Sequence, residues 1–415
     1  MLPPERRTRV DLIVAAAIVV VLIVAATIVW LFSDARGTTS VTAEQAPDPV
    51  ASVSAPPETL AQAWDAPSAA TTTPVTAADS VVVTADGGAV VGRDRRSGDE
   101  LWRYERDLEL CGVVGAWDDV VAVYRDDRGC SQATKLRGGT GVRDVARNSD
   151  ADPNVTVTDE GTYVSSRGDR RMELWRSDLV RTLEYGRVDA QVNPKSQPRS
   201  GCRLLDSGAS DSRAAVLESC PGEQAARLTI LDPAPDDGRE PDEFNSSVLA
   251  ELDLDAEGAR IIAVSGDNTA VYLPAGSTAG DRIGIYGGDG EQLSVYPLPR
   301  PVGPDVLAAT TGPNDSKHST ISWWTGTEVL KLDPRSLQPQ WAFVGTLGPG
   351  AAMGNNLLVP VKSGIAVLDL ASGRPQRVIE FDRGDYEGPI TTTVLGGVIL
   401  EQRGDTVVAL RSHTD

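Results

Sequence analysis

The sequence has very few of the residues on which most catalytic sites depend. Its 415 residues include two His, four Cys and three Met, and aromatic residues make up 5%. Since His413 lies at the C-terminal end, a Ser-His-Asp or Cys-His arrangement would rest on His318 alone, and no nucleophile elbow lies near it. A phosphate-binding G-x-x-x-x-G-K-[ST] loop and a strand-linked G-x-G-x-x-G are also missing. We therefore expect neither hydrolase chemistry nor nucleotide binding.

Positive charge is scarce as well. The chain has 39 Lys and Arg against 59 Asp and Glu, a net charge of −20. An acidic surface repels phosphate backbones and anionic lipid headgroups, because both partners carry the same sign. Nucleic acid is therefore excluded as an expected partner.

The four cysteines form no C-x-x-C motif, which argues against a zinc site. They fall into two local pairs, Cys111 with Cys130 and Cys202 with Cys220. Three pairings are formally possible. We favour the local one because each pair brackets a strand-like stretch, and a closed loop of this size stabilises by about 3 kcal/mol. Disulfides are typical of an exported domain.

The N-terminus carries the clearest single element. Residues Leu12 to Phe32 form an uncharged apolar run, long enough at about 1.5 Å per residue to cross a bilayer. Arg6, Arg7 and Arg9 precede the run, so the positive-inside bias leaves the N-terminus in the cytoplasm. The alternative is a cleaved signal peptide, with Ser33-Asp34-Ala35 as a poor cleavage site.

This pattern divides the chain into four parts. We expect a cytoplasmic N-terminus over 1–11, a transmembrane helix over 12–32, a flexible linker over 33–60 and an extracytoplasmic domain over 61–415. The linker assignment depends on Pro47, Pro49, Pro56 and Pro57, which interrupt regular structure. The predicted location is the cell membrane, with a single span.

Beyond Trp64, short β-branched runs alternate with Gly, Asp and Asn turns, and no stretch has a 3.6-residue apolar period. This pattern predicts an all-β domain. Hairpin units of about 40 residues favour an eight-bladed β-propeller, with seven blades as the alternative. The units begin near Asp79, Trp117, Asp159, Ser212, Arg260, Ser319, Asn355 and Gly396. Because the last unit ends early, we expect the strand around Ala61–Ala66 to supply its outer strand.

A turn motif recurs in three units, in which an Asp is followed three positions later by a Ser and a new strand then begins. The residues that carry it are Asp94, Gly98 and Trp102; Asp333 and Trp341; and Asp369 and Gly373. Leu337 replaces the Gly in the second copy, and Arg377 replaces the Trp in the third. We expect the Asp to cap the turn and the Trp to pack between adjacent blades.

The motif resembles the tryptophan-docking repeat of pyrroloquinoline-quinone (PQQ)-like propellers. That resemblance implies one of two functions. Quinoprotein dehydrogenases hold a quinone and calcium on the ring axis and use an adjacent Cys-Cys pair, which is missing here. Non-catalytic envelope propellers, such as the BamB-like subunits of outer-membrane assembly machinery, bind partners through loops. We expect a non-enzymatic scaffold for envelope or membrane proteins, without cofactor or metal; the alternative is a ligand-binding protein or a PQQ- or sugar-dependent oxidoreductase.

Two further features are candidate sites. The acidic insertion Asp232–Glu243 could bind calcium, although its prolines and spacing are more typical of a solvated loop. Trp323 and Trp324 are adjacent in a strand and so point to opposite faces. One of the two rings could therefore contact a partner, while packing of both between blades is the alternative.

Overall fold

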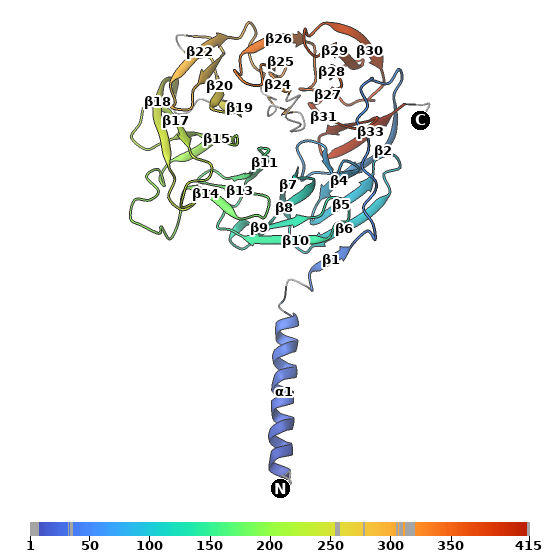
Figure 1. Cartoon of the computed structure of the whole chain (residues 1–415), viewed down its shortest axis with the longest axis vertical. Coiled ribbons are helices and arrows are strands. Elements are labelled where there is room, and N and C mark those ends of the chain that lie inside the picture. Colours follow the sequence, from blue (N-terminus) through green and yellow to red (C-terminus); the bar gives the residue numbers. More distant parts are fainter. Residues whose placement is uncertain are drawn as a thin grey trace.

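The computed structural model describes residues 8–31, 33, 36–253, 258–276, 279–303, 306, 310–311 and 320–412. Within these residues the chain forms one N-terminal helix and eight β-sheets that are arranged as a ring (Figure 1). The expected eight-bladed β-propeller is therefore confirmed, and the seven-bladed alternative is wrong.

Helix α1 (Arg9–Leu31) is long and apolar enough to cross a membrane. Its first turn is capped reciprocally. The Asp11 backbone N–H donates to Thr8 Oγ1 at 3.3 Å, while the Thr8 N–H donates to Asp11 Oδ2 at 2.7 Å. Every described side chain of α1 lies outside the protein core, as expected of a helix that has an apolar surface on all sides.

Each blade is an antiparallel sheet whose first strand lies nearest the ring axis (Figure 1). Blades 1 to 4 contain β3 (Val75–Ala77), β4 (Val81–Asp86), β5 (Ala89–Asp94) and β6 (Glu100–Arg106); β7 (Leu110–Ala116), β8 (Asp119–Asp126), β9 (Gly129–Leu136) and β10 (Arg143–Asn148); β11 (Thr156–Asp159), β12 (Val164–Arg167), β13 (Arg171–Trp175) and β14 (Arg181–Gly186); and β15 (Arg203–Ala209), β16 (Ala214–Ser219), β17 (Ala225–Leu231) and β18 (Glu243–Asp253).

Blades 5 to 8 contain β19 (Arg260–Ser265), β20 (Asn268–Leu273), β21 (Arg282–Tyr286) and β22 (Gln292–Pro297); β23 (Thr310–Thr311), β24 (Ile321–Trp324), β25 (Glu328–Leu332) and β26 (Pro339–Val344); β27 (Ala351–Met353), β28 (Asn356–Val361), β29 (Gly364–Asp369) and β30 (Pro375–Glu380); and β31 (Ile390–Leu395), β32 (Val398–Arg403) and β33 (Thr406–Arg411), with β2 (Ala61–Pro67).

The middle strands explain why apolar runs, and not strict alternation, dominate the sequence. Both faces of β4 and β8 are covered by neighbouring blades, so five consecutive residues of β4 and six of β8 are buried. The outer strands β22 and β26 alternate between more and less exposed positions, as strands with one covered face do.

The ring is closed by strands from the two ends of the propeller. Strand β2 pairs antiparallel with β33, so that Ala66 lies opposite Val407. This pairing confirms the expected closure. The last blade therefore depends on a segment that precedes the first blade, and the two ends of the domain are held together.

The segment expected to be a linker differs from the prediction. Residues Thr38–Val41 form a strand, β1, that adds to the outer edge of β6 as a fifth strand of blade 1. Further along, the Val50 N–H donates to Asp79 O at 2.9 Å, and Arg377 Nη2 donates to Pro56 O at 2.9 Å. Prolines exclude helix from this segment, but they do not prevent an extended chain from binding sheet edges and turns.

The predicted units begin too late in most blades. In the sequence they start at the turn after the innermost strand, for example near Asp79, whereas blade 1 starts at Val75. Innermost strands such as β3 and β27 contain only three residues, so they give little periodic signal.

The Asp-containing motif is the turn between the third and fourth strands of a blade. Asp94 Oδ1 accepts hydrogen bonds from the N–H groups of Arg96 and Ser97, at 2.8 and 2.9 Å. Asp333 and Asp369 cap their turns in the same way. Leu337, which replaces the Gly, adopts the same left-handed conformation at φ 58° and is fully buried.

The Trp residues of the motif dock on the turn of the next blade. The Trp102 indole N–H donates to Gly138 O at 2.9 Å, and its ring lies against Gly141. Trp64 packs in the same way on Gly98, and Trp341 on Gly373. Arg377 stands where a Trp would dock, and it binds the carbonyls of Pro56 and Pro57 instead. The docking turn of blade 2, Thr140-Gly141, was not recognised from the sequence, because Arg137 replaces the Asp.

Candidate functional site

Two long connections between strands, both described in full, lie at the rim of blades 3 and 4. A long connection, residues 187–202, joins β14 to β15, and the acidic insertion Asp232–Glu243 joins β17 to β18. We call these the 187–202 loop and the insertion. The loop is held by buried charged residues and by a disulfide, whereas the insertion is held by hydrogen bonds to β14 and to the loop.

Both local disulfides are formed. Cys111 is bonded to Cys130 and Cys202 to Cys220, as expected. The second bond attaches the end of the 187–202 loop to the residue that follows β16. The sulfur atoms of Cys202 and Cys220 lie near a carboxylate of Glu218, but they are bonded to each other and so are not free thiolates for a metal.

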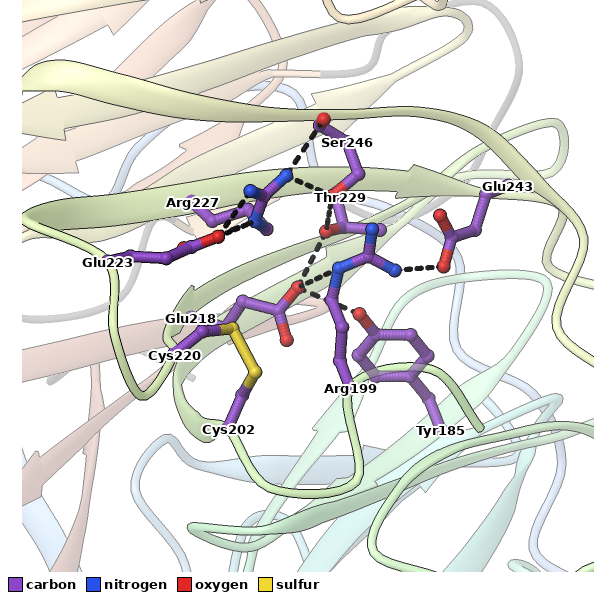
Figure 2. The surroundings of a disulfide bond; sticks show 10 residues. All are labelled: Tyr185, Arg199, Cys202, Glu218, Cys220, Glu223, Arg227, Thr229, Glu243 and Ser246. Atoms are coloured by element: carbon purple, nitrogen blue, oxygen red, sulfur yellow. Dashed lines mark hydrogen bonds and ion pairs between the residues drawn. A yellow bond between two sulfur atoms is a disulfide. The ribbon is translucent and has the colours of Figure 1, made fainter. Parts of the chain in front are cut away.

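Glu218 lies beside this disulfide and connects two blades (Figure 2). Its Oε1 accepts hydrogen bonds from Tyr185 of blade 3 at 2.8 Å and from Thr229 of blade 4 at 2.6 Å. Arg199 of the 187–202 loop lies 3.6 Å from the same oxygen and also pairs with Glu243. Burial raises the pKa of Glu218, and these donors oppose the increase. The loop is therefore fixed through Arg199.

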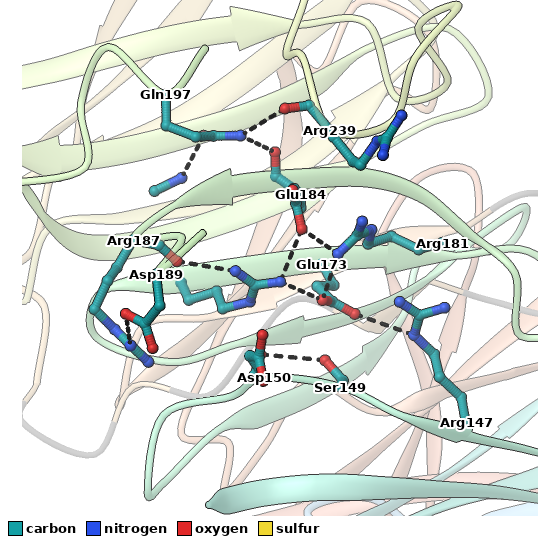
Figure 3. Close-up of polar contacts among 12 residues, drawn as sticks. Arg147, Ser149, Asp150, Glu173, Arg181, Glu184, Arg187, Asp189, Gln197 and Arg239 are labelled. Atoms are coloured by element: carbon teal, nitrogen blue, oxygen red, sulfur yellow. Dashed lines mark hydrogen bonds and ion pairs between the residues drawn. The ribbon is translucent and has the colours of Figure 1, made fainter. Parts of the chain in front are cut away.

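A second buried network fixes the other end of the loop (Figure 3). Arg171 donates to Glu173 at 2.7 Å, to Glu184 at 2.9 Å and to the carbonyl of Arg187 at 3.0 Å. Burial alone would raise the pKa of Glu173, but the guanidinium groups of Arg147 and Arg171 outweigh it, and the pKa lies below its usual value. The charges of blade 3 and Arg147 of blade 2 therefore compensate one another.

The insertion lies along the outer edge of blade 3. The Glu184 N–H donates to Gly238 O at 2.7 Å, which occupies an edge position of β14. Gln197 Nε2 bridges the carbonyls of Glu184 and Arg239, at 3.1 and 3.2 Å (Figure 3). Asp237 is held by Arg239, which keeps its pKa near 2. The insertion thus covers the edge of β14 and contains its own ion pair, Arg239–Asp237. Its residues are not arranged as they are in a typical calcium-binding loop.

A groove of about 520 Å³ lies between the 187–202 loop and the insertion. It is lined by Asn193, Pro194, Lys195, Ser196, Pro198, Arg199, Glu240, Pro241 and Glu243. The lining carries both charge signs and three prolines, and its walls are held by Arg199 and Gln197. A preformed polar groove of this kind can bind an extended segment of a partner at low entropic cost.

Three carboxylates lie near the ring axis in blades 3 and 4. Burial raises the pKa of Asp159 to about 6 and that of Glu160 to about 7. Glu160 accepts a hydrogen bond from the Ala209 N–H of the next blade at 3.1 Å, and Asp206 accepts one from the Ile261 N–H at 2.9 Å. Glu160 and Asp206 therefore connect successive inner strands. The sequence did not single out Glu160 and Asp206, because their partners lie 49 and 55 positions further along the chain.

The two adjacent tryptophans do not reach the surface. Trp323 is fully buried and Trp324 is 4% exposed. Trp323 packs against Tyr272 of blade 5, with 5.4 Å between ring centroids, and the Trp324 indole donates to Thr346 O at 3.1 Å. The hypothesis that one ring contacts a partner is wrong, since each face of this strand is covered by another blade. His318 and His413 lie outside the described residues.

The fold and this rim define the molecule as an eight-bladed β-propeller that follows an N-terminal apolar helix. The sequence matches no protein-family model and no curated protein. Among solved structures, Sqt1 of Saccharomyces cerevisiae is similar, with a TM-score of 0.50 and 9% identity over 87% of this chain and 99% of that one. The structure of the dihydro-heme d1 dehydrogenase NirN gives a TM-score of 0.49 and 16% identity, over 86% and 76%. At 9% identity the likeness to Sqt1 shows the fold alone.

Proposed function

We propose that this chain is a non-enzymatic, membrane-anchored scaffold whose extracytoplasmic propeller binds an envelope protein through the rim of blades 3 and 4. The observation that supports this most directly is the groove between the 187–202 loop and the insertion. Buried ion pairs and a disulfide hold its walls, whereas most other turns of the ring are short. A rigid groove that is built at one place on a repeating scaffold is typical of a recognition surface.

We also propose that the propeller is similar in role to the BamB-like branch of PQQ-like propellers. It is supported by the docking of Trp64, Trp102 and Trp341 on the turns of successive blades. The anchor, with the N-terminus in the cytoplasm, is supported by the length and apolarity of α1 and by two disulfides in the domain that follows.

The test removes the insertion without disturbing its blade. The Asp232 N–H donates to Asp242 O at 2.9 Å, so this bond closes the insertion at its base. Residues 233–241 can therefore be replaced by a short Gly-Ser turn between β17 and β18. We expect this variant to lose its partner in cells. The purified variant should nevertheless unfold at a temperature similar to that of the unmodified protein. A variant that keeps the partner unchanged would contradict the assignment of this rim.

The oxidoreductase alternative has a separate test. Addition of PQQ and calcium to the purified protein should give neither a change in quinone absorbance nor dye-linked oxidation of alcohols or aldoses. Reproducible turnover would overturn the scaffold proposal, whichever rim binds the partner.

A further inference from the structure

The disulfide between Cys202 and Cys220 lies against a buried carboxylate. Its two sulfur atoms and one carboxylate oxygen of Glu218 lie within 4.8 Å of one another, and all three residues are buried. In the part of the chain that the structure describes, this is the only such group of three potential metal ligands, so the disulfide between Cys111 and Cys130 belongs to none. The two disulfides therefore differ in the carboxylate that lies beside the second one.

The two carboxylate oxygens of Glu218 have different surroundings (Figure 2). Oε1 accepts hydrogen bonds from Tyr185 at 2.8 Å and from Thr229 at 2.6 Å, and Nε of Arg199 lies 3.6 Å from it. Oε2 is buried and has no hydrogen-bond partner among the described residues. In Figure 2 the oxygen without a dashed line lies on the side of the sulfur atoms. Since a disulfide donates no hydrogen bond, it leaves this buried oxygen unsatisfied, which is unfavourable.

The reduced form of the cysteine pair would change these surroundings. Cysteines enter a chain as thiols, so a dithiol form of Cys202 and Cys220 precedes the disulfide. Thiolates bind metal ions, and zinc takes sulfur, nitrogen and carboxylate oxygen ligands with tetrahedral geometry. Two thiolates and Oε2 of Glu218 supply three such ligands at one place, and a water molecule would complete the four.

The residues around Glu218 suit a carboxylate that binds a metal ion. At metal sites, hydrogen bonds from neighbouring residues orient the carboxylate ligand. Tyr185 and Thr229 bind only Oε1, and so they would hold the side chain with Oε2 free for the metal. Two thiolates and a carboxylate leave one negative charge on a zinc site, and the guanidinium of Arg199 lies where it compensates that charge. The site therefore has its ligands, their orientation and its charge balance.

We propose that Cys202, Cys220 and Glu218 bind one zinc ion when the two cysteines are reduced. Each thiol releases its proton as its sulfur binds zinc, and no electron is transferred. Formation of the disulfide removes both thiolates and so excludes the metal. In either state the end of the 187–202 loop is attached to the residue that follows β16. The proposal concerns metal binding and does not depend on the scaffold function.

The experiment uses the full chain in detergent micelles, reduced with a phosphine, which has no thiol to compete for zinc. Equilibrium dialysis against zinc, followed by elemental analysis, gives the stoichiometry and the affinity. Cobalt replaces zinc in a parallel sample, because a thiolate-to-cobalt charge-transfer band shows directly that sulfur binds the metal. Thermal unfolding of each sample, with and without zinc, verifies that the chain is folded.

Three variants separate the ligands from the rest of the protein. Glu218→Gln retains the size of the side chain and removes its charge. Cys202→Ser with Cys220→Ser removes both sulfur ligands. Cys111→Ser with Cys130→Ser is the matched control, because it removes the cysteine pair that has no carboxylate beside it among the described residues.

We expect one zinc ion per reduced chain and none per oxidised chain. The affinity should fall about tenfold or more in Glu218→Gln, be lost without Cys202 and Cys220, and be unchanged in the matched control. Zinc should raise the melting temperature of the reduced chain alone, since a ligand stabilises the state that binds it. The proposal is wrong if the reduced chain binds no zinc or stays unfolded in its presence. Equal binding at both cysteine pairs, or an unchanged affinity in Glu218→Gln, would also overturn it.

Discussion

At the scale of single residues, Glu160 links protonation to stability. Burial raises its pKa to about 7, and the neighbouring Asp159 and Asp206 add to the shift. A carboxyl whose pKa is higher in the folded chain than in the unfolded chain favours folding while it is protonated. The unfolded value is about 4.5. The contribution of Glu160 to the free energy of unfolding should therefore decrease as pH rises from about 4.5 to 7. Chemical denaturation across this range should show the decrease, and Glu160→Gln should flatten it; an unchanged profile in that variant would contradict the assignment.

Arg171 is the residue on which the blade 3 network most depends. It is 3% exposed and neutralises Glu173 and Glu184 at once. Because its removal leaves buried carboxylates with less compensation, Arg171→Met should lower the free energy of unfolding by about 3–5 kcal/mol. Arg176→Met serves as the control, since the Arg176–Asp178 pair is exposed and should contribute nothing measurable. Equal effects of the two substitutions in urea denaturation would show that the network is not stabilising.

At the scale of elements, the contribution of Trp docking to stability can be measured separately from the backbone strain of a turn. Gly141 and Gly404 both have positive φ, at 70° and 54°. A Cβ on Gly141 would lie 2.6 Å from the Trp102 ring, whereas one on Gly404 would meet nothing within 4 Å. Gly404→Ala should therefore lower the free energy of unfolding by about 1 kcal/mol through backbone strain alone. Gly141→Ala should lower it by about 1–3 kcal/mol more, because the new Cβ would also clash with the Trp102 ring. Similar melting temperatures for both variants would mean that docking at this turn is loose.

The sequence predicted the elements that leave a local signal and missed those that depend on contacts between distant residues. The Asp turns, the two disulfides and the closing strand were predictable, because each depends on local spacing or on a unit that lacked one strand. The buried charges were not: Arg171, Glu173 and Glu218 are ordinary charged residues until the blades bring them together. Strand β1 was missed for a related reason, since edge pairing depends on an available neighbour, β6, and not on the propensity of Thr38–Val41.

At the scale of the whole molecule, closure of the ring by β2 should determine its cooperativity. A chain that begins at residue 36 keeps β1 and β2, whereas one that begins at residue 68 leaves blade 8 with three strands and removes Trp64 from Gly98. We expect the longer chain to unfold in one cooperative transition. The shorter chain should unfold earlier and over a broader range, as measured by differential scanning calorimetry. If the two chains unfolded over the same temperature range, closure of the ring by β2 would add little to the stability of the propeller.

The central claim, that the rim of blades 3 and 4 binds an envelope protein, is tested most directly by site-specific photo-cross-linking of the full chain in its own cells. Benzoylphenylalanine replaces Lys195 in the groove or, as a matched control, the exposed Lys362 of blade 7. We predict one discrete protein adduct from position 195, lost when residues 233–241 are replaced, and none of that mass from position 362. The same adduct from both positions, or an adduct from 195 that persists without the insertion, would contradict the account.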